Sequence, residues 1–273
     1  MSVSAIILNF NRPDYIQNHI LPALSKIKEI NQVVISNGKK ETAIGITKYG
    51  EYLKILDHYG EMNKEYGLTL RFLSSLKAKN KYVMIMDDDI IPTPETVKFL
   101  LERVKTEPSR IHGMYGRDLL DGKTYSYENV FGEVPVVLTR CLMTTKEKCQ
   151  FFMDNFRLYE SDLIKTSRPY WNGEDILFSL LSVQSTGKMN RAYDLSHTNR
   201  VLNYLDPGTS ISIGGDHISY RQKLVTSLME KMVISDVIKK EKKIIKKRYQ
   251  LTYFLENTDL LKYLSFGYLA NLF

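Results

Sequence analysis

The stretch KYVMIMDDDIIPTP, residues 81–94, joins an apolar run directly to three adjacent carboxylates. The apolar half predicts a buried strand that stops at Asp87. Three neighbouring acids repel one another, so a fold keeps them together only where water or a cation neutralises them. Alternation along an extended chain sends Asp87 and Asp89 to one side and Asp88 to the other. The pattern therefore predicts a site for Mg²⁺ or Mn²⁺ at Asp87 and Asp89, with a solvated acidic turn as the alternative.

Strands alternate with helices through the first hundred residues. Apolar runs predict strands over residues 3–10, 32–36, 52–56 and 82–86. Helical spacing predicts a helix that begins near Pro13, one over residues 64–78, and one over 94–104 that is capped by Thr93. This alternation indicates a parallel, Rossmann-like sheet, and it puts the acidic triplet at the carboxyl edge, where open α/β sheets bind ligands.

The middle of the chain changes character. Residues 121–123 form a predicted turn between short strand-like runs, and residues 134–143 form a further predicted strand. We expect this part to extend the sheet in an antiparallel or mixed way. A helix follows over residues 174–183, and residues 203–217 are rich in Gly, Ser and Asp, which predicts a loop near the site.

The composition is that of an ordinary globular protein. Of the 273 residues 43% are hydrophobic and 25% are charged, which allows one sizeable core. Two cysteines are too few for a disulfide framework, and no spacing indicates a zinc site. The N-terminal apolar run is too short for a signal peptide, and no stretch of 18 apolar residues exists. We expect a soluble, cytoplasmic protein.

The positive charge is concentrated near the C-terminus. Residues 231–248 hold eight Lys or Arg against two acids, a net +6 of the chain's +7. A nucleic-acid binder usually spreads its basic stripe across the fold, so we expect no nucleic-acid partner. The predicted domains are 1–230, with a nucleotide-binding half (1–89) and an acceptor half (90–230), and a basic amphipathic helical tail, 231–273. The tail is expected to pack on the catalytic domain or on a second subunit, and the alternative is peripheral contact with an anionic membrane.

A second acidic motif, WNGEDIL, spans residues 171–177. Acids in the first turn of a helix are favoured by the helix dipole alone. The functional interpretation is that one carboxylate faces the cleft, as a base for an incoming hydroxyl or as a partner for a cationic sugar-like transition state. Trp171 offers a flat face for stacking a sugar ring, or is a buried core residue.

These residues together resemble a glycosyltransferase of the GT-A fold, and most closely the exostosin-type family that builds heparan-sulfate-like glycans. Four blocks match in order: IILNFNRPDY (6–15), VVISN (33–37), MIMDDD (84–89) and NGEDI (172–176). A fainter fifth block is GDHISYR (215–221). The resemblance covers about residues 3 to 228. It implies an α/β GT-A fold, a Rossmann-like mixed sheet flanked by helices, with a C-terminal helical extension.

The resemblance also implies roles for single residues. Asp175 would be the catalytic carboxylate at the anomeric carbon, and Arg221 would reach the phosphates of the leaving group. The residues expected to contact the nucleotide sugar are Asn11, Arg12, Asn37, Asn63, Arg71, Asp87 and Asp88. Asp89 would bind the divalent ion, together with Asp87. Trp171, Asn172 and Glu174 are expected on the acceptor side.

Two departures from the family pattern stand out. The family places an Arg five residues after its Asn, where this chain has Leu68, and Arg71 one turn further on is the candidate substitute. The membrane anchor and disulfides of the family are missing, which indicates a soluble relative of the stripped-down kind known from large algal viruses. A late His sometimes completes the metal shell of such enzymes, but for His197 and His217 a solvated or capping role is favoured.

The leading hypothesis is a glycosyltransferase that depends on Mn²⁺ or Mg²⁺. It would move a sugar from a UDP-sugar, of the UDP-xylose or UDP-N-acetylhexosamine class, to a hydroxyl of a glycan or glycoprotein. The chain lacks G-x-G-x-x-G and G-x-x-x-x-G-K-[ST], which argues against dehydrogenases and P-loop NTPases. Two alternatives stay open: a sugar-phosphate nucleotidyltransferase, although residues 9–14 hold no glycine-rich loop, and a non-catalytic glycan-binding protein.

Overall fold

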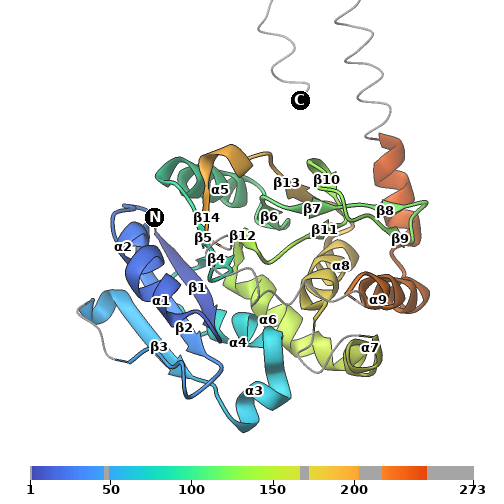
Figure 1. The fold of residues 1–273 in the computed structure, drawn as a ribbon. Helices are drawn as coiled ribbons and strands as arrows, with labels where there is room; N and C mark the ends of the chain where they lie inside the picture. The colour runs from blue at the N-terminus through green and yellow to red at the C-terminus, as the bar shows by residue number, and fades with distance from the viewer. Residues whose placement is uncertain (1, 46–48, 167–171, 203–216, 245–273) are drawn as a thin grey trace, which may run out of the picture.

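The structure is a computed structural model that describes residues 2–45, 49–166, 172–202 and 217–244 (Figure 1). Within these residues, eight strands form one central sheet in the order β10-β13-β6-β12-β4-β1-β2-β3. Its parallel half consists of β1 (Val3–Asn9), β2 (Ile30–Asn37), β3 (Leu53–Asp57) and β4 (Tyr82–Met86). The predicted alternation of strands and helices is therefore confirmed for the first ninety residues.

The second half of the sheet is mixed, as the sequence predicts. Next to β4 lies β12 (Cys141–Thr145), which runs antiparallel both to β4 and to β6 (His112–Gly113). Beyond β6 lie β13 (Asn190–Ala192), parallel to it, and β10 (Gly132–Val134), antiparallel to β13. Since β4 and β12 are neighbours in one sheet, the halves 1–89 and 90–230 share a single layer of strands.

Both faces of the sheet are covered by helices. Successive side chains of a strand point to opposite faces, and these strands carry apolar side chains on both, so each face needs a cover. Ile7, Ile35 and Met84 pack with helices on one face. These helices are α1 (Pro13–Tyr15), a π-helical turn (Ile16–Ile20), α2 (Leu21–Leu24) and α5 (Pro94–Thr106). As predicted, Pro13 begins the first helix and the Thr93 side chain caps α5.

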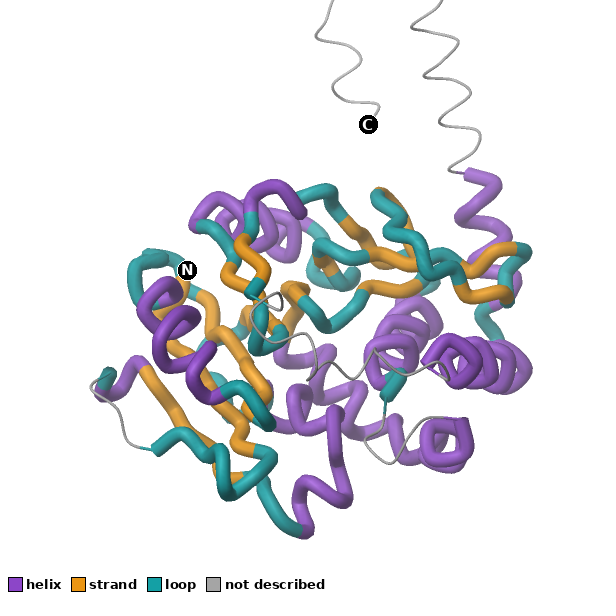
Figure 2. The backbone as a smooth tube through the Cα atoms, in the orientation of Figure 1, coloured by secondary structure: helices purple, strands orange, loops and turns teal. Residues whose placement is uncertain are grey.

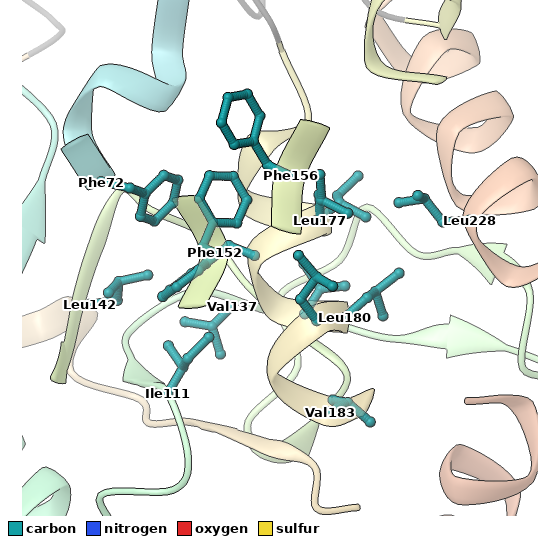
Figure 3. Packing of buried hydrophobic residues seen from close by; sticks show 14 of the residues in the cluster. Phe72, Ile111, Val137, Leu142, Phe152, Phe156, Leu177, Leu180, Val183 and Leu228 are labelled. Atoms are coloured by element: carbon teal, nitrogen blue, oxygen red, sulfur yellow. The ribbon is translucent and has the colours of Figure 1, made fainter. Parts of the chain in front are cut away.

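The larger core lies on the other face and contains Ile6, Val34 and Ile85. The helices there are α4 (Leu70–Ser75), α6 (Lys146–Asn155), α7 (Glu160–Thr166), α8 (Glu174–Thr186) and α9 (His217–Lys231). Phe72 of α4 packs against Phe152 of α6 with ring centroids 4.2 Å apart (Figure 3). Helices pack beside the strands (Figure 2). Because both faces of the sheet are covered, the ends of the strands are left for a site.

Two predicted elements are broken by residues that oppose regular structure. The helix expected over 64–78 divides into α3 (Glu61–Tyr66), a 3₁₀ turn (Gly67–Thr69) and α4, because Gly67 adopts a φ of +46°. The strand expected over residues 134–143 is interrupted at Pro135, which has no N–H to donate, so that β10 ends at Val134. It continues as β11 (Val136–Val137), which pairs with β7 (Gly116–Arg117), and then as β12.

Short ribbons complete the architecture. The predicted turn at residues 121–123 is confirmed, since it joins β8 (Leu119–Leu120) to β9 (Thr124–Tyr125). Directly after the acidic triplet, β5 (Ile90–Ile91) pairs antiparallel with β14 (Arg200–Val201). Trp171 and most of the loop predicted at 203–217 lie outside the described residues.

The first part of the basic tail packs on the residues that precede it. Residues 235–244 are helical, and Ile234 and Ile238 are fully buried in the larger core. Lys242 also forms an ion pair with Asp118 at 2.8 Å. The described part of the tail, residues 231–244, therefore packs on the preceding residues, as the favoured interpretation expects, and the boundary after residue 230 stays a prediction. Residues 245–273 lie outside the described part, and none of the helices within it is long and apolar enough to cross a membrane.

The packing of the tail helix can be tested at Ile238. Because Ile238 is fully buried, Ile238→Ala should lower the free energy of unfolding by about 2–4 kcal/mol, as measured by urea denaturation. Val233 is 85% exposed, so the control Val233→Ala should stay within about 0.5 kcal/mol of the wild type. Equal, small effects of the two substitutions would show that the helix does not dock.

Candidate active site

A cavity of about 380 Å³ lies where β1 and β4 end and α8 and α9 begin. Five arginines of the described chain line it: Arg12, Arg71, Arg117, Arg140 and Arg221. Five acids line it as well: Asp87, Asp88, Asp89, Glu174 and Asp175. The fold thus brings the acidic triplet and the second acidic motif, which are 85 positions apart in the sequence, to one cavity.

The acidic triplet is neutralised by two arginines. Nη1 of Arg12 lies 2.8 Å from Asp88 Oδ1 and 3.3 Å from Asp89 Oδ2. Asp87 Oδ1 instead lies 3.1 Å from Nη1 of Arg71. The alternation expected along residues 87–89 does not hold, although all three carboxylates line the same cavity. That expectation assumed an extended chain, whereas the backbone turns at Asp88 and Asp89, and these two share one guanidinium nitrogen.

The triplet retains carboxylate capacity that its arginines do not use. Burial raises the pKa of Asp88 to about 7, although Arg12 opposes the shift. Burial and the charge of Asp87 likewise raise the pKa of Asp89. Within the described residues, the buried Oδ1 of Asp89 has no hydrogen-bond partner, and no three acidic, His or Cys side chains gather to hold a metal. The residues fit a divalent cation of the Mg²⁺ type, which commonly binds one or two carboxylates and completes its shell with phosphate and water.

The second acidic motif opens helix α8 against α9. Gly173 has a φ of +113°, and an added Cβ there would lie 2.3 Å from Leu224 Cδ2. Only glycine permits both this conformation and this close approach of the two helices. The helix that carries Asp175 is thereby fixed beside the helix that carries Arg221.

Asp175 and Arg221 form the closest ion pair of the site, with Oδ2 and Nη2 2.6 Å apart. Arg221 also donates from Nη1 to Asn172 Oδ1 at 3.2 Å and from Nε to the hydroxyl of Tyr125 at 3.2 Å. Burial by itself lowers the pKa of Arg221, but Asp175 outweighs this and raises it. The guanidinium is therefore a permanent cation held from three directions.

Asn172 links this pair to His217. Because Asn172 Oδ1 accepts from Arg221, its Nδ2 donates to His217 Nδ1, 2.9 Å away. Both ends of the Asn172 side chain are thus used within the protein, although the residue still lines the cavity. His197 lies in a 3₁₀ turn, Ser196–Thr198, and lines neither described cavity.

Glu174 points to a different set of partners from Asp175. Its Oε1 accepts from the Thr139 hydroxyl at 3.1 Å and lies 3.4 Å from Arg71 Nε, and its Oε2 accepts from the Gly173 N–H at 3.2 Å. The residue is only 3% exposed. Burial raises the pKa of Glu174 to about 7, because the charge of Arg71 only partly offsets the loss of water.

A second cavity of about 220 Å³ adjoins the first. The two share four lining residues, Leu8, Phe10, Asn11 and Leu68. The second is mostly apolar and is also bordered by Asn63 and Gly38. An added Cβ at Gly38 would lie 3.0 Å from Asn63 Oδ1 and 3.1 Å from the Phe10 ring, so the glycine keeps this space open. The predicted residues Asn11 and Asn63 therefore meet at one small apolar cavity.

Asn37 does not reach either cavity. It is fully buried, and its amide is saturated within the protein. Its Nδ2 donates to Ile44 O and to Asp57 Oδ1, and its Oδ1 accepts from Asn9 Nδ2 and from the Ile44 N–H. In this geometry the Asn37 side chain organises the loop after β2, and the role expected for it as a direct contact of the nucleotide stays a prediction.

Several residues that line the first cavity were not predicted from the sequence. Arg117, Arg140, Tyr125, Tyr127 and Thr139 all border the first cavity. Arg140 arrives there because β12 pairs antiparallel with β4, and its carbonyl accepts the Asp87 N–H at 3.0 Å. Tyr125 and Tyr127 stack edge to face at 4.9 Å. The two tyrosines, two positions apart after the predicted turn at 121–123, are a pattern in the sequence that could have indicated this contact. The place of Arg140 depends instead on the pairing of β12 with β4.

Comparison with known proteins identifies one matching family. The profile of the glycosyl transferase family 64 domain matches residues 3–249, which is most of the chain. No curated protein sequence matches the chain.

Three solved structures of TarS from S. aureus are similar at a low level. TarS 1-349 is 18% identical with a TM-score of 0.45, over 70% of this chain and 57% of that one. TarS, and TarS 1-349 in complex with UDP-GlcNAc, are each 19% identical with a TM-score of 0.46, over 70% of this chain and 34% and 55% of theirs. The chain therefore spans less than two thirds of each of these structures, and the likeness carries no conclusion about activity.

Replacing Glu174 by Gln should change how stability depends on pH. The folded protein keeps the Glu174 proton up to about pH 7, whereas an unperturbed Glu releases it near pH 4.5. Between these values the folded state binds more protons, so rising pH lowers the free energy of unfolding of the wild type, and above pH 7 this loss is complete. Gln has no such proton. The stability of Glu174→Gln relative to the wild type should therefore grow by up to about 1.4 kcal/mol per pH unit across this window.

Urea denaturation at pH 5 and at pH 7.5 measures this difference. Glu95 is exposed in the first turn of α5, so Glu95→Gln is the control for a loss of carboxylate in water. A stability difference for Glu174→Gln that is the same at both pH values would contradict the prediction.

Proposed function

The chain belongs to glycosyl transferase family 64, and on this basis we propose that it transfers a sugar from a UDP-sugar to a hydroxyl of a glycan or glycoprotein. The observation that carries the proposal is the pair of adjoining cavities. One is small and apolar, the other is lined by both acids and arginines, and they share Phe10 and Asn11. A nucleoside diphosphate sugar has the same order of parts, a flat base followed by a charged diphosphate and a polar sugar.

In this proposal the uridine occupies the second cavity. Leu8, Phe10 and Leu70 supply apolar surface for the base, and Asn11 and Asn63 supply amide groups for its polar edge. Arg12 and Arg71 lie toward the first cavity, where the diphosphate would follow. Guanidinium groups suit phosphate oxygens because they present donors in a fixed fork.

Asp87 and Asp89 would hold Mg²⁺ or Mn²⁺, with Asp88 held by Arg12. A divalent cation in this place supplies charge neutralisation for the leaving diphosphate. The arginines of the chain add fixed positive charge to the same end of the cavity, which stabilises negative charge as it develops. The unpartnered Asp89 Oδ1 is the feature that supports this assignment.

Asp175 is the carboxylate we propose for the anomeric carbon. It lies in the first cavity, 2.6 Å from Arg221, so a carboxylate and a cation stand side by side at the reacting end. Asp175 would either accept the proton of the acceptor hydroxyl, in an inverting displacement, or stabilise a cationic sugar, in a retaining one. Arg221 would steady the departing phosphate in both cases.

The acceptor would enter past Tyr125, Tyr127 and Asn172, which line the cavity beside Asp175. The donor classes we favour, UDP-xylose and UDP-N-acetylhexosamine, follow from the resemblance to exostosin-type enzymes. After β1 the chain continues as Asn9-Phe10-Asn11-Arg12 rather than as a glycine-rich loop. This sequence, with the family match, disfavours the sugar-phosphate nucleotidyltransferase.

Donor binding should depend on metal and on the acidic triplet. In calorimetry with Mn²⁺, Asp89→Ala should weaken UDP binding by about a hundredfold or more, since loss of a mere outer partner of a metal site already costs about 10- to 100-fold. Asp14 is exposed on α1 and lines neither cavity, so Asp14→Ala is the matched control and should bind as the wild type does. Equal UDP affinity in both variants would sink the assignment of the donor site.

Asp175→Asn should lower turnover by on the order of a hundredfold or more while it keeps UDP affinity, because the loss affects the reacting end and not the nucleotide. Turnover is measured as sugar transfer or donor hydrolysis. NMR of the anomeric proton in the product distinguishes an inverting base from a retaining electrostatic partner. A variant that turns over at the wild-type rate would place the active site elsewhere.

A further inference from the structure

Arg71 and Glu174 join the acidic triplet to the start of helix α8. Arg71 comes from α4, and its Nη1 lies 3.1 Å from Asp87 Oδ1. Its Nε donates to Leu68 O at 3.2 Å and lies 3.4 Å from Glu174 Oε1. Arg71 is 6% exposed and Glu174 is 3% exposed, so both charges sit in a low-dielectric setting where their geometry is tightly constrained.

The Glu174 carboxylate is committed to the protein. Oε1 is shared by the Thr139 hydroxyl and Arg71, and Oε2 accepts from the Gly173 N–H. A side chain that is this buried and this fully bonded is badly placed to receive an acceptor sugar, whose hydroxyls need accessible partners. The position expected on the acceptor side therefore has another role.

Arg71 still has a donor to offer. It lines the first cavity, and no described residue accepts a hydrogen bond from its Nη2. Burial by itself lowers the pKa of Arg71, but Glu174 and then Asp87 outweigh this, and the pKa is raised. The group is thus a permanent cation at the wall of the cavity, directed there by carboxylates on two sides.

We propose that Glu174 is a positioning residue, which holds Arg71 so that its guanidinium meets the oxygens of the donor diphosphate. The inference rests on the proposed function, since it needs a diphosphate in the first cavity. Asp87 is also a proposed metal ligand, so its hold on Arg71 weakens when it turns to a ligand. Glu174 lies on a helix that Gly173 fixes in place, and it is the anchor that does not change between the free and the bound protein.

A double-mutant cycle tests this role against an acceptor-binding role. Glu174→Gln, Arg71→Lys and the double variant are assayed at pH 8 for donor hydrolysis without acceptor and for transfer with acceptor. Glu174→Gln should lower kcat of hydrolysis by on the order of ten- to a hundredfold, the scale of a misplaced catalytic-site group, and should leave the acceptor KM unchanged. The double variant should be no slower than Arg71→Lys alone, because both changes disrupt the same Glu174–Arg71 pair.

Glu133 provides a matched control, because it forms a similarly buried ion pair with Arg110 at 2.9 Å and lines neither cavity. Glu133→Gln should leave kcat of the folded protein unchanged and should be additive with Arg71→Lys. If Glu174→Gln does not fold, Thr139→Val removes the hydroxyl that donates to Glu174 and should lower kcat of hydrolysis by a smaller factor, again without raising the acceptor KM.

The outcomes distinguish the proposed function from the positioning role of Glu174. A wild type that neither binds UDP nor hydrolyses any UDP-sugar would overturn the proposed function, and the positioning role with it. An active wild type in which Glu174→Gln raises the acceptor KM but hydrolyses donor normally would overturn the positioning role alone. Multiplicative effects of Glu174→Gln and Arg71→Lys would do the same.

Discussion

Mutual neutralisation of carboxylates and guanidinium groups is the condition on which the first cavity depends. Five acids and five arginines of the described chain line it, and either set alone would carry a desolvation cost that a marginally stable fold does not supply. Arg12 meets Asp88 and Asp89, Arg71 meets Asp87 and Glu174, and Arg221 meets Asp175. Each acid therefore has a cation beside it before any substrate arrives.

This arrangement explains why elements from the whole chain converge on the cavity. The arginines come from the turn after β1, from α4 and from α9, whereas the acids come from the end of β4 and the start of α8. Each pair thus ties two separate elements together.

The two hydrophobic layers give the cavity its rigid base. The parallel strands bury both faces, so their ends are held at fixed heights by packing from the two sides. On one side the layer extends through α9 to Ile234 and Ile238, so the segment that carries Arg221 is anchored at both ends of its helix. The docked tail helix is in this sense part of the support of the site.

The sequence by itself determined the parallel half of the sheet, the cap of α5, the start of the first helix at Pro13, and the two acidic motifs, because these depend on local periodicity and on residue type. The tertiary structure decided the rest. It assigned Asp87 and Asp88 to different arginines, buried Asn37 and Glu174 within protein contacts, and brought Arg140 and Tyr127 to the cavity. These outcomes follow from strand pairing and helix packing between distant segments, and no local pattern in the chain encodes which charged side chains will meet across them.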